Sequence, residues 1–493
     1  MARAYFALRA LDAQVEATER TLRLREDGLR LQKKRAEAGA GEPGIAAALA
    51  AFSAPAREKA APAQTLLAAP QTVRDKVYPQ MVFPPEEYRL LALFRFWNVI
   101  HYFFPYKHLT DQPWDSVLPE FIPRMLACKD ALDYATAVAE LAARIQDTHA
   151  WAVTGLYPLE NKLGVMAPPL RVGHAAGDKL VVLELMDEAA AQAAGIQRGD
   201  VILTIDGEPV AQRLAALAKY RSLSTPQSAY AYVYPSALRG PPGSKAKLRI
   251  ESGNGEPRDV EIARTVAYFS AMAAPVRRTP VYQVLPNGDG YIDLTRLQQS
   301  DAAQALDAVL NTPGLILDMR GYPGGDASAL TARLTAKQNV TGLLDRYLLL
   351  TPAALRAAES GKGPTYVFKE YKLPAAQGAV YKGKVVMLIN AHAISAAESA
   401  CLIVEAATDV TFIGGPTVGA DGAVTTVTLP GLLPGGISIT FSGYDLRHAD
   451  GRQLQRVGVQ PHVKVEPTPQ GIREGRDEVL ERAFEYLKQN RQR

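Results

Sequence analysis

Apolar, strand-like runs alternate with helix-like runs between residues 280 and 467, and this order constrains the fold more than any other feature. The candidate strands are residues 289–294, 314–320, 384–390, 411–415 and 436–441, and the candidate helices are residues 300–311, 327–336 and 395–408. Alternation of this kind is typical of α/β layer folds with a largely parallel sheet. We therefore predict an α/β core over residues 267–493 that ends in a basic, amphipathic helix.

Three segments of different composition precede this core. Residues 1–40 are predicted to form one long, coiled-coil-like helix, because apolar side chains recur near heptad spacing. The pattern AYFALRALDAQ within it resembles the periplasmic helices of TolC-type outer-membrane efflux proteins, which implies a fused or truncated N-terminus. Residues 41–80 are rich in Ala and Pro and are predicted to be a linker. Residues 81–165 are predicted to form a helical domain.

Residues 166–266 have strand-like periodicity, and a short helix and a Gly-containing turn interrupt them. The pattern G-x-x-x-G-D-x-I-L-x-I-D-G runs from Gly195 to Gly207. This order resembles a PDZ domain, which implies capture of a peptide C-terminus by strand addition. The alternative is a small β domain with no peptide role.

Charge and composition exclude several functional classes. The 55 basic and 51 acidic side chains give a net charge of +4, which offers no support for a nucleic-acid partner. The sequence has neither an HExxH pattern nor a GxxxxGK loop, so we expect neither a metal nor another cofactor. Its two cysteines, Cys128 and Cys401, lie in apolar, helix-like stretches and are predicted to be buried thiols.

The first candidate for chemistry is Ser395, which follows the apolar run of residues 384–390 and begins an Ala-rich helix. Free N–H groups at a helix start favour negative charge. A serine there can attack a substrate while a neighbouring amide, that of Ala396, stabilises the oxyanion. The alternative is a helix N-cap.

The second candidate is the loop GYPGG, residues 321–325, which follows another apolar strand. Consecutive glycines let the backbone approach a ligand closely, so Gly324 and Gly325 are predicted to complete an oxyanion hole. The alternative is a tight strand-to-helix turn. Arg320, just before the loop, is expected to anchor it through Asp318 or Asp326.

Together these features resemble peptidase family S41, which includes the C-terminal-processing proteases, tricorn protease and the interphotoreceptor retinoid-binding protein repeats. The resemblance spans residues 85–485 and rests on YIDL, LILDMRGYPGG, VVMLIN followed by SAAES, FIGGPTVGADG and VGVQPHV in the family's order. It implies a crotonase/ClpP-like α/β protease core with an inserted PDZ-like domain and an N-terminal helical segment.

The same resemblance implies which residue serves as the base. The bacterial members pair the serine with a lysine, but this protein has Ala420 at that position and no lysine between Ser395 and Lys464. The tricorn branch uses a histidine at the end of the helical segment, which matches His149. A histidine can take up the serine proton near neutral pH and return it to the leaving amine. Thr148 is expected to support the site.

A third residue should orient the His149 ring. Tricorn uses a glutamate, and the corresponding residue here is Gln455, which can accept the imidazole N–H but offers no charge. Asp147 and Asp421 remain alternative orienting groups.

The function expected is a serine endopeptidase or C-terminal-processing peptidase that acts on the ends of polypeptides or on unfolded segments. A catalytically weak peptide-binding or apolar-ligand-binding protein on the same scaffold is the alternative, as is a hydrolase of other acyl substrates. A homo-oligomer is compatible with either. The family is usually exported, whereas the N-terminus printed here lacks the apolar core of a signal peptide.

Overall fold

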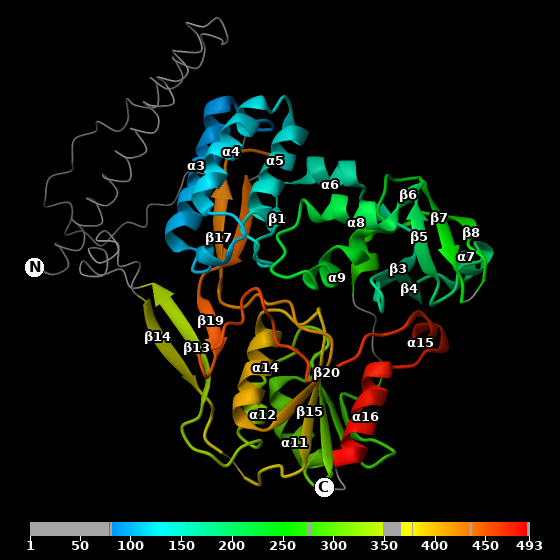
Figure 1. Ribbon diagram of the computed structural model, residues 1–493, viewed down its shortest axis with the longest axis vertical. Coiled ribbons are helices and arrows are strands. Elements are labelled where there is room, and N and C mark those ends of the chain that lie inside the picture. Colours follow the sequence, from blue (N-terminus) through cyan, green and yellow to red (C-terminus); the bar gives the residue numbers. More distant parts are fainter. Residues whose placement is uncertain are drawn as a thin grey trace, which may run out of the picture.

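The computed structural model describes residues 78, 81–154, 156–253, 255–273, 279–348, 366–376, 378–432 and 436–490. The long helix and almost all of the linker predicted for residues 1–80 therefore lie outside the described residues. Within the described residues, α-helices and several β-sheets are combined, as predicted for a mixed α/β protein (Figure 1).

A six-stranded sheet forms the centre of the C-terminal part of the described residues. Its spatial order is β10 (Tyr282–Val284), β11 (Gly290–Asp293), β12 (Gly314–Asp318), β15 (Lys384–Ile389), β16 (Val410–Gly414) and β20 (Val463–Lys464). The last five strands are parallel and only β10 is antiparallel. The largely parallel sheet predicted from the alternating pattern is confirmed.

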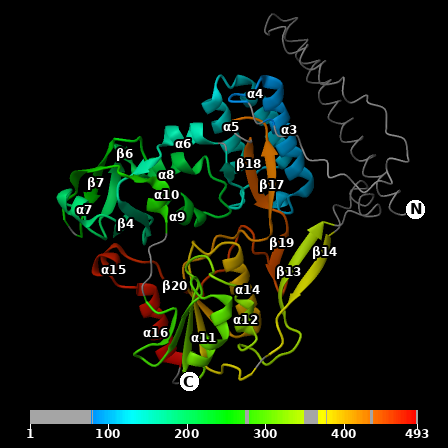
Figure 2. The same cartoon turned by 180° about the vertical axis from the view of Figure 1, so that it is seen from behind.

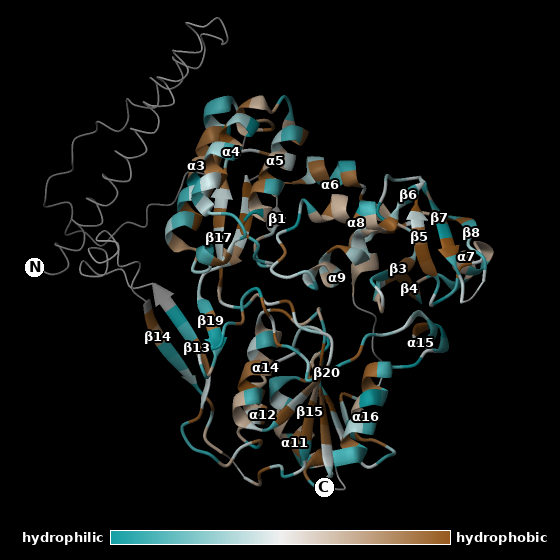
Figure 3. Cartoon of the chain, viewed as in Figure 1, coloured by the Kyte–Doolittle hydropathy of each residue, from teal (hydrophilic) through white to brown (hydrophobic). Residues whose placement is uncertain are grey.

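Helices cover both faces of this sheet, which explains why its central strands β12, β15 and β16 are largely apolar and buried. Leu317 and Met387 point to one face, where they pack with α11 (Ala302–Val309) and α14 (Ala396–Ala407). Ile316 and Val386 point to the other face, which α16 (Glu478–Asn490) covers. Apolar residues are concentrated on the central strands in Figure 3.

Two elements differ from the sequence prediction. The segment predicted as a strand of the core becomes β18 (Ile437–Ser442) in a separate antiparallel sheet, with the order β1 (Ala152–Thr154), β18 and β17 (Val424–Leu429). Ile439 and Phe441 face an apolar core while Thr440 and Ser442 alternate with them, a pattern typical of a sheet with one polar face. The helix predicted over 327–336 is shortened to α12 (Ser328–Thr331).

Three helices pack on this antiparallel sheet (Figures 1 and 2). They are α3 (Glu86–Phe103), α4 (Trp114–Ala127) and α5 (Ala131–Ala143), and they share one buried apolar cluster with β17 and β18. Strand β18 and the helical segment are thus joined although nearly 300 residues separate them. Both Cys128 and Cys401 are buried free thiols, as predicted.

The segment between the helices and the parallel sheet forms a β-rich unit. Its sheet has the order β3 (Leu170–Ala175), β4 (Lys179–Leu185), β5 (Val201–Ile205), β7 (Lys245–Glu251) and β8 (Arg258–Ala263), with β6 (Glu208–Pro209) beside β5. Helices α7 (Glu188–Ala193), α8 (Val210–Ala218) and α9 (Ser228–Tyr232) accompany it. Gly199 has a φ of 79° and approaches the C-terminal segment so closely that a Cβ atom would lie 2.4 Å from Pro469 O.

Smaller elements complete the described part of the protein. Strand β2 (Met166–Ala167) pairs with β9 (Val266–Ala267), near the helix α10 (Tyr268–Met272). A separate three-stranded sheet contains β14 (Tyr366–Lys372), β13 (Thr341–Leu348) and β19 (Asp445–His448). The remaining helices are α6 (Tyr157–Leu163) and α15 (Pro469–Glu474). Within the described ranges, none of the helices is both long and apolar enough to cross a lipid bilayer.

Candidate active site

Ser395 lies in a strained turn between β15 and α14. Its φ of 57° and ψ of −124° are unusual for a residue with a side chain, and they cost on the order of 1–3 kcal/mol. The backbone holds this conformation, since Ser395 N–H donates to Ala420 O at 2.9 Å and Ser395 O accepts from Glu398 N–H at 2.7 Å. The Ser395 side chain makes no capping hydrogen bond to α14, so the simple N-cap interpretation is not supported.

Glu398 holds the turn that faces Ser395. The Glu398 carboxyl is fully buried and accepts hydrogen bonds from Gly419 N–H at 2.7 Å and Ala420 N–H at 2.8 Å. Burial raises the pKa of Glu398 to about 7, against the lowering effect of hydrogen bonds from Thr417 and the turn. Glu398 is not among the site residues predicted from the sequence. Its signal there is the spacing S-x-x-E, which places Glu398 one turn of helix from Ser395.

Asp421 is buried beside the same helix. Its Oδ2 accepts from Ser399 Oγ at 2.6 Å, and its Oδ1 accepts from Gly422 N–H at 2.6 Å. Burial raises the pKa of Asp421 to about 8. Asp421 therefore supports the turn that follows Ala420, and among the described contacts it does not orient the His149 ring.

His149 lies in a buried polar cluster after α5. Its Nδ1 is 2.8 Å from Ser442 Oγ on β18, and only 6% of His149 is exposed. Ser442 Oγ in turn donates to Asp147 Oδ1 at 3.1 Å. Burial lowers the pKa of His149, and the Asp147 charge opposes this effect. His149 is therefore a neutral ring at neutral pH, as a general base must be.

Gln455 contacts Asp147 rather than His149, which corrects the prediction that its amide oxygen accepts the imidazole N–H. Gln455 Nε2 donates to Asp147 Oδ1 at 3.2 Å, and Gln455 Oε1 is buried with no partner in the described part of the protein. Ser442 occupies the position expected for Gln455. Nothing near Ser442 forms a motif, and its partner His149 is 293 residues away, so the sequence carried no signal for it.

Thr148 is bonded to Ser224 rather than to the His149 ring. Thr148 N–H donates to Ser224 Oγ at 2.8 Å, and Ser224 N–H donates to Thr148 Oγ1 at 2.9 Å. Asp147 N–H similarly donates to Ser222 Oγ at 2.9 Å. These bonds attach the His149 segment to the residues that follow α8.

Backbone contacts join the Ser395 turn to the His149 cluster. The residue after Gln455, Arg456, donates its N–H to Gly419 O at 2.9 Å, next to the carbonyl that holds Ser395. Within the described residues, Ser395 Oγ and His149 Nε2 make no hydrogen bond to each other. Catalytic hydrogen bonds are often longer without substrate, so the arrangement is compatible with a nucleophile and base that meet when substrate binds.

The glycine loop lies against the segment after β11. Gly324 N–H donates to Leu294 O at 3.0 Å, which corrects the prediction that this N–H is available to an oxyanion. Gly325 N–H and Ala396 N–H have no partner among the residues that the structure describes. A Cβ on Gly325 would lie 2.7 Å from the nitrogen of Gln299, so a side chain is excluded there.

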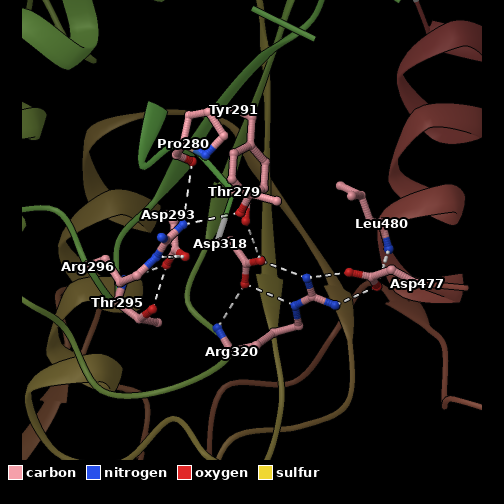
Figure 4. Close-up of polar contacts among 10 residues, drawn as sticks. All are labelled: Thr279, Pro280, Tyr291, Asp293, Thr295, Arg296, Asp318, Arg320, Asp477 and Leu480. Carbon is pink, nitrogen blue, oxygen red and sulfur yellow. Dashed lines mark hydrogen bonds and ion pairs between the residues drawn. The ribbon is translucent and has the colours of Figure 1, made fainter. Parts of the chain in front are cut away.

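Arg320 anchors the start of the glycine loop through Asp318, as predicted, and additionally through Asp477 at the start of α16 (Figure 4). Arg320 Nη2 is 2.6 Å from Asp318 Oδ2 and 2.8 Å from Asp477 Oδ2. Tyr291 OH also donates to Asp318 at 2.9 Å. The guanidinium is thus engaged by two carboxylates and holds the end of β12 against α16.

Among the described residues, no group of three or more His, Cys, Asp or Glu side chains is arranged to hold a metal ion. The residues described above supply a serine hydroxyl, an imidazole, buried carboxyls and two backbone N–H groups without partners among the described residues.

Comparison with known proteins supports a family resemblance over part of the protein. Residues 289–465 match the model of peptidase family S41, so the predicted resemblance to this family is confirmed. The matched range contains the parallel strands from β11 to β20, the glycine loop, Ser395 and Gln455. His149 lies outside it.

The solved structures of CPAF share the fold at low sequence identity. Mature CPAF has a TM-score of 0.61 at 16% identity, over 82% of this protein and 96% of CPAF. CPAF complexed with lactacystin has a TM-score of 0.60 at 15% identity, over 82% of this protein and 98% of CPAF. The photosystem II D1 C-terminal processing protease has a TM-score of only 0.43 at 17% identity, over 77% and 93% of the two proteins. No match was found among curated proteins.

Proposed function

We propose that this protein is a serine peptidase in which Ser395 is the nucleophile and His149 is the general base. The observation that carries this proposal is the strained backbone of Ser395 at the start of α14, which keeps the Oγ atom out of the helix cap. The match to a peptidase family over residues 289–465, which include Ser395, supports hydrolase chemistry.

In the proposed reaction Ser395 Oγ attacks the carbonyl carbon of a peptide bond while its proton moves to His149 Nε2. The N–H groups of Ala396 and Gly325 stabilise the oxyanion of the tetrahedral intermediate. His149 then gives the proton to the leaving amine, and an acyl-enzyme remains on Ser395. Water hydrolyses this ester, again with His149 as the base.

We propose that the unit over residues 166–266 acts as a PDZ-type domain that presents a polypeptide end to a crotonase/ClpP-like core over residues 267–493. The short helix α7 between β4 and β5 and the glycine turn at Gly199 support this assignment. The substrate class would be unfolded polypeptides or the C-terminal ends of polypeptides. Assembly of several copies would be compatible with this role.

Proteolysis of an unfolded substrate tests the proposal. Wild-type protein is expected to cleave a permanently unfolded polypeptide such as casein, and Ser395→Ala and His149→Ala are expected to abolish cleavage while they remain folded. The second candidate, a binding protein without catalysis, is favoured by the missing bond between Ser395 and His149. It would be supported if wild-type protein retains the polypeptide but releases no fragments.

A further inference from the structure

Asp147 is the centre of the polar cluster around His149. Its carboxylate is fully buried and accepts four hydrogen bonds. Two come from Ser442, from Oγ at 3.1 Å and from N–H at 2.7 Å, one comes from His149 N–H at 3.2 Å, and one from Gln455 Nε2 at 3.2 Å. A buried carboxylate with this many donors is compensated for the loss of water.

The number of available protons determines how the His149 ring is protonated. Ser442 has one hydroxyl proton and two neighbours, Asp147 Oδ1 at 3.1 Å and His149 Nδ1 at 2.8 Å. A carboxylate can only accept, so the Ser442 proton goes to Asp147 and the ring must donate its proton from Nδ1 to Ser442. The lone pair is then left on Nε2, which is the tautomer that a general base for a serine needs.

We propose that Ser442 and Asp147 together are the positioning residues of His149, in the role that the sequence predicts for Gln455. The inference rests on the function proposed above. The hydroxyl of Ser442 transmits the negative charge of Asp147 to Nδ1, so the ring is held in one tautomer and its cationic form is stabilised during catalysis.

This arrangement gives a reason for the glutamine at position 455. Asp147 already supplies the buried negative charge, and Gln455 donates one of the four hydrogen bonds that stabilise it. A second buried carboxylate at 455 would repel Asp147 and would remove that donor. The hydrogen-bonded relay from Asp147 through Ser442 to His149 therefore requires a neutral donor at position 455. Gln455→Glu is expected to lower peptidase activity rather than raise it.

Nuclear magnetic resonance of the full-length protein labelled with ¹⁵N and ¹³C in histidine tests the relay without using activity. The His149 signal is assigned by its absence in His149→Ala. The proton of neutral wild-type His149 is expected on Nδ1. Ser442→Ala should abolish this preference and lower the His149 pKa, and Asp147→Asn should lower it further, because burial then acts without the opposing charge. Thr440→Val is the matched control, since Thr440 Oγ1 bonds only to backbone carbonyls of this segment, including that of His149.

A wild-type ring protonated on Nε2 would overturn the proposal, and so would an unchanged tautomer and pKa in folded Ser442→Ala. Because the wild-type tautomer needs no variant, poor folding of Asp147→Asn does not remove the test. If the His149 proton is on Nδ1 but the protein has no peptidase activity, the proposed function is refuted, whereas the positioning of His149 by Ser442 and Asp147 is supported.

Kinetics supply the second readout. If wild-type protein cleaves casein, Ser442→Ala is expected to lower kcat/KM by about 100-fold, less than the ~10⁴-fold loss known for a triad held in the wrong tautomer. Ser442→Thr keeps the hydroxyl and is expected to recover most of the rate. An increase of kcat/KM in Gln455→Glu would contradict the relay.

Discussion

Replacement of Ser395 by glycine should stabilise the protein relative to replacement by alanine, although both variants lose the nucleophile. The Ser395 backbone at φ 57° and ψ −124° suits glycine and strains any other residue by about 1–3 kcal/mol. Glycine loses more backbone entropy on folding than alanine, which offsets about 0.5–1 kcal/mol of this gain. The free energy of unfolding of Ser395→Gly should therefore exceed that of Ser395→Ala by about 1 kcal/mol, or about 2 °C in the thermal midpoint.

Differential scanning calorimetry of the two variants measures this difference directly. Ser399, one turn further along α14, provides the control because its backbone is helical. There the order should be reversed, with glycine about 1 kcal/mol less stable than alanine. If Ser395→Ala is the more stable of the Ser395 pair, the turn is not strained and the geometric case for Ser395 as a nucleophile fails.

Three further predictions concern the surroundings of Ser395. In Glu398→Gln the new NH₂ group faces a buried N–H such as that of Ala420, at a cost of about 1–3 kcal/mol for one unpaired group, so the thermal midpoint should fall by a few degrees and casein cleavage should slow. The same change at Glu405, which lies on the same helix and pairs with His448 and Arg452, should leave casein cleavage unchanged. Burial raises the pKa of Glu398 to about 7 and that of Asp421 to about 8. In the unfolded state both groups lose their protons near pH 4, so the stabilising contribution of their protonated forms is lost as the pH rises from about 4 to about 8. The thermal midpoint of wild-type protein should fall over that range, and it should fall by less in Asp421→Asn; a flat wild-type profile would contradict this. Gly325→Ala places a methyl group 2.7 Å from a backbone nitrogen and should displace the loop, with a loss of kcat larger than the change in KM; unchanged kcat would remove Gly325 from the oxyanion hole.

The sequence predicted those parts of the protein that local patterns encode. Continuous apolar runs indicated the parallel strands, and the turn before Ser395 was recognisable because strand, turn and helix adjoin in the sequence. The strand over 436–441 was predicted for the wrong sheet. Alternating apolar and polar residues indicate that one face of a strand is polar, but they do not specify which sheet the strand joins.

Long-range contacts explain the remaining differences. Ser442 contacts His149 across 293 residues, and the pairing of β1 with β18 brings the two segments together. The family motif therefore points to Gln455, whose position in the sequence corresponds to that of the tricorn glutamate. The contact to the His149 ring is instead made by Ser442, which lies outside every motif. The conformational freedom of Gly324 likewise predicts a place in the oxyanion hole. Its N–H is instead bonded to Leu294 O, and this contact depends on the packing of the loop, which the sequence does not reveal.

Labelling with a fluorophosphonate probe reports whether Ser395 is an activated nucleophile, because the probe reacts with a serine only when a base activates it. We predict a single labelled peptide that contains Ser395, no labelling in Ser395→Ala or His149→Ala, and full labelling in Ser116→Ala, whose serine is exposed on α4. Reaction should persist at neutral pH, where His149 is uncharged because burial lowers its pKa. Folded wild-type protein that stays unlabelled between about pH 6 and pH 9, the range over which a histidine base becomes neutral, would contradict the assignment of Ser395 as a catalytic nucleophile.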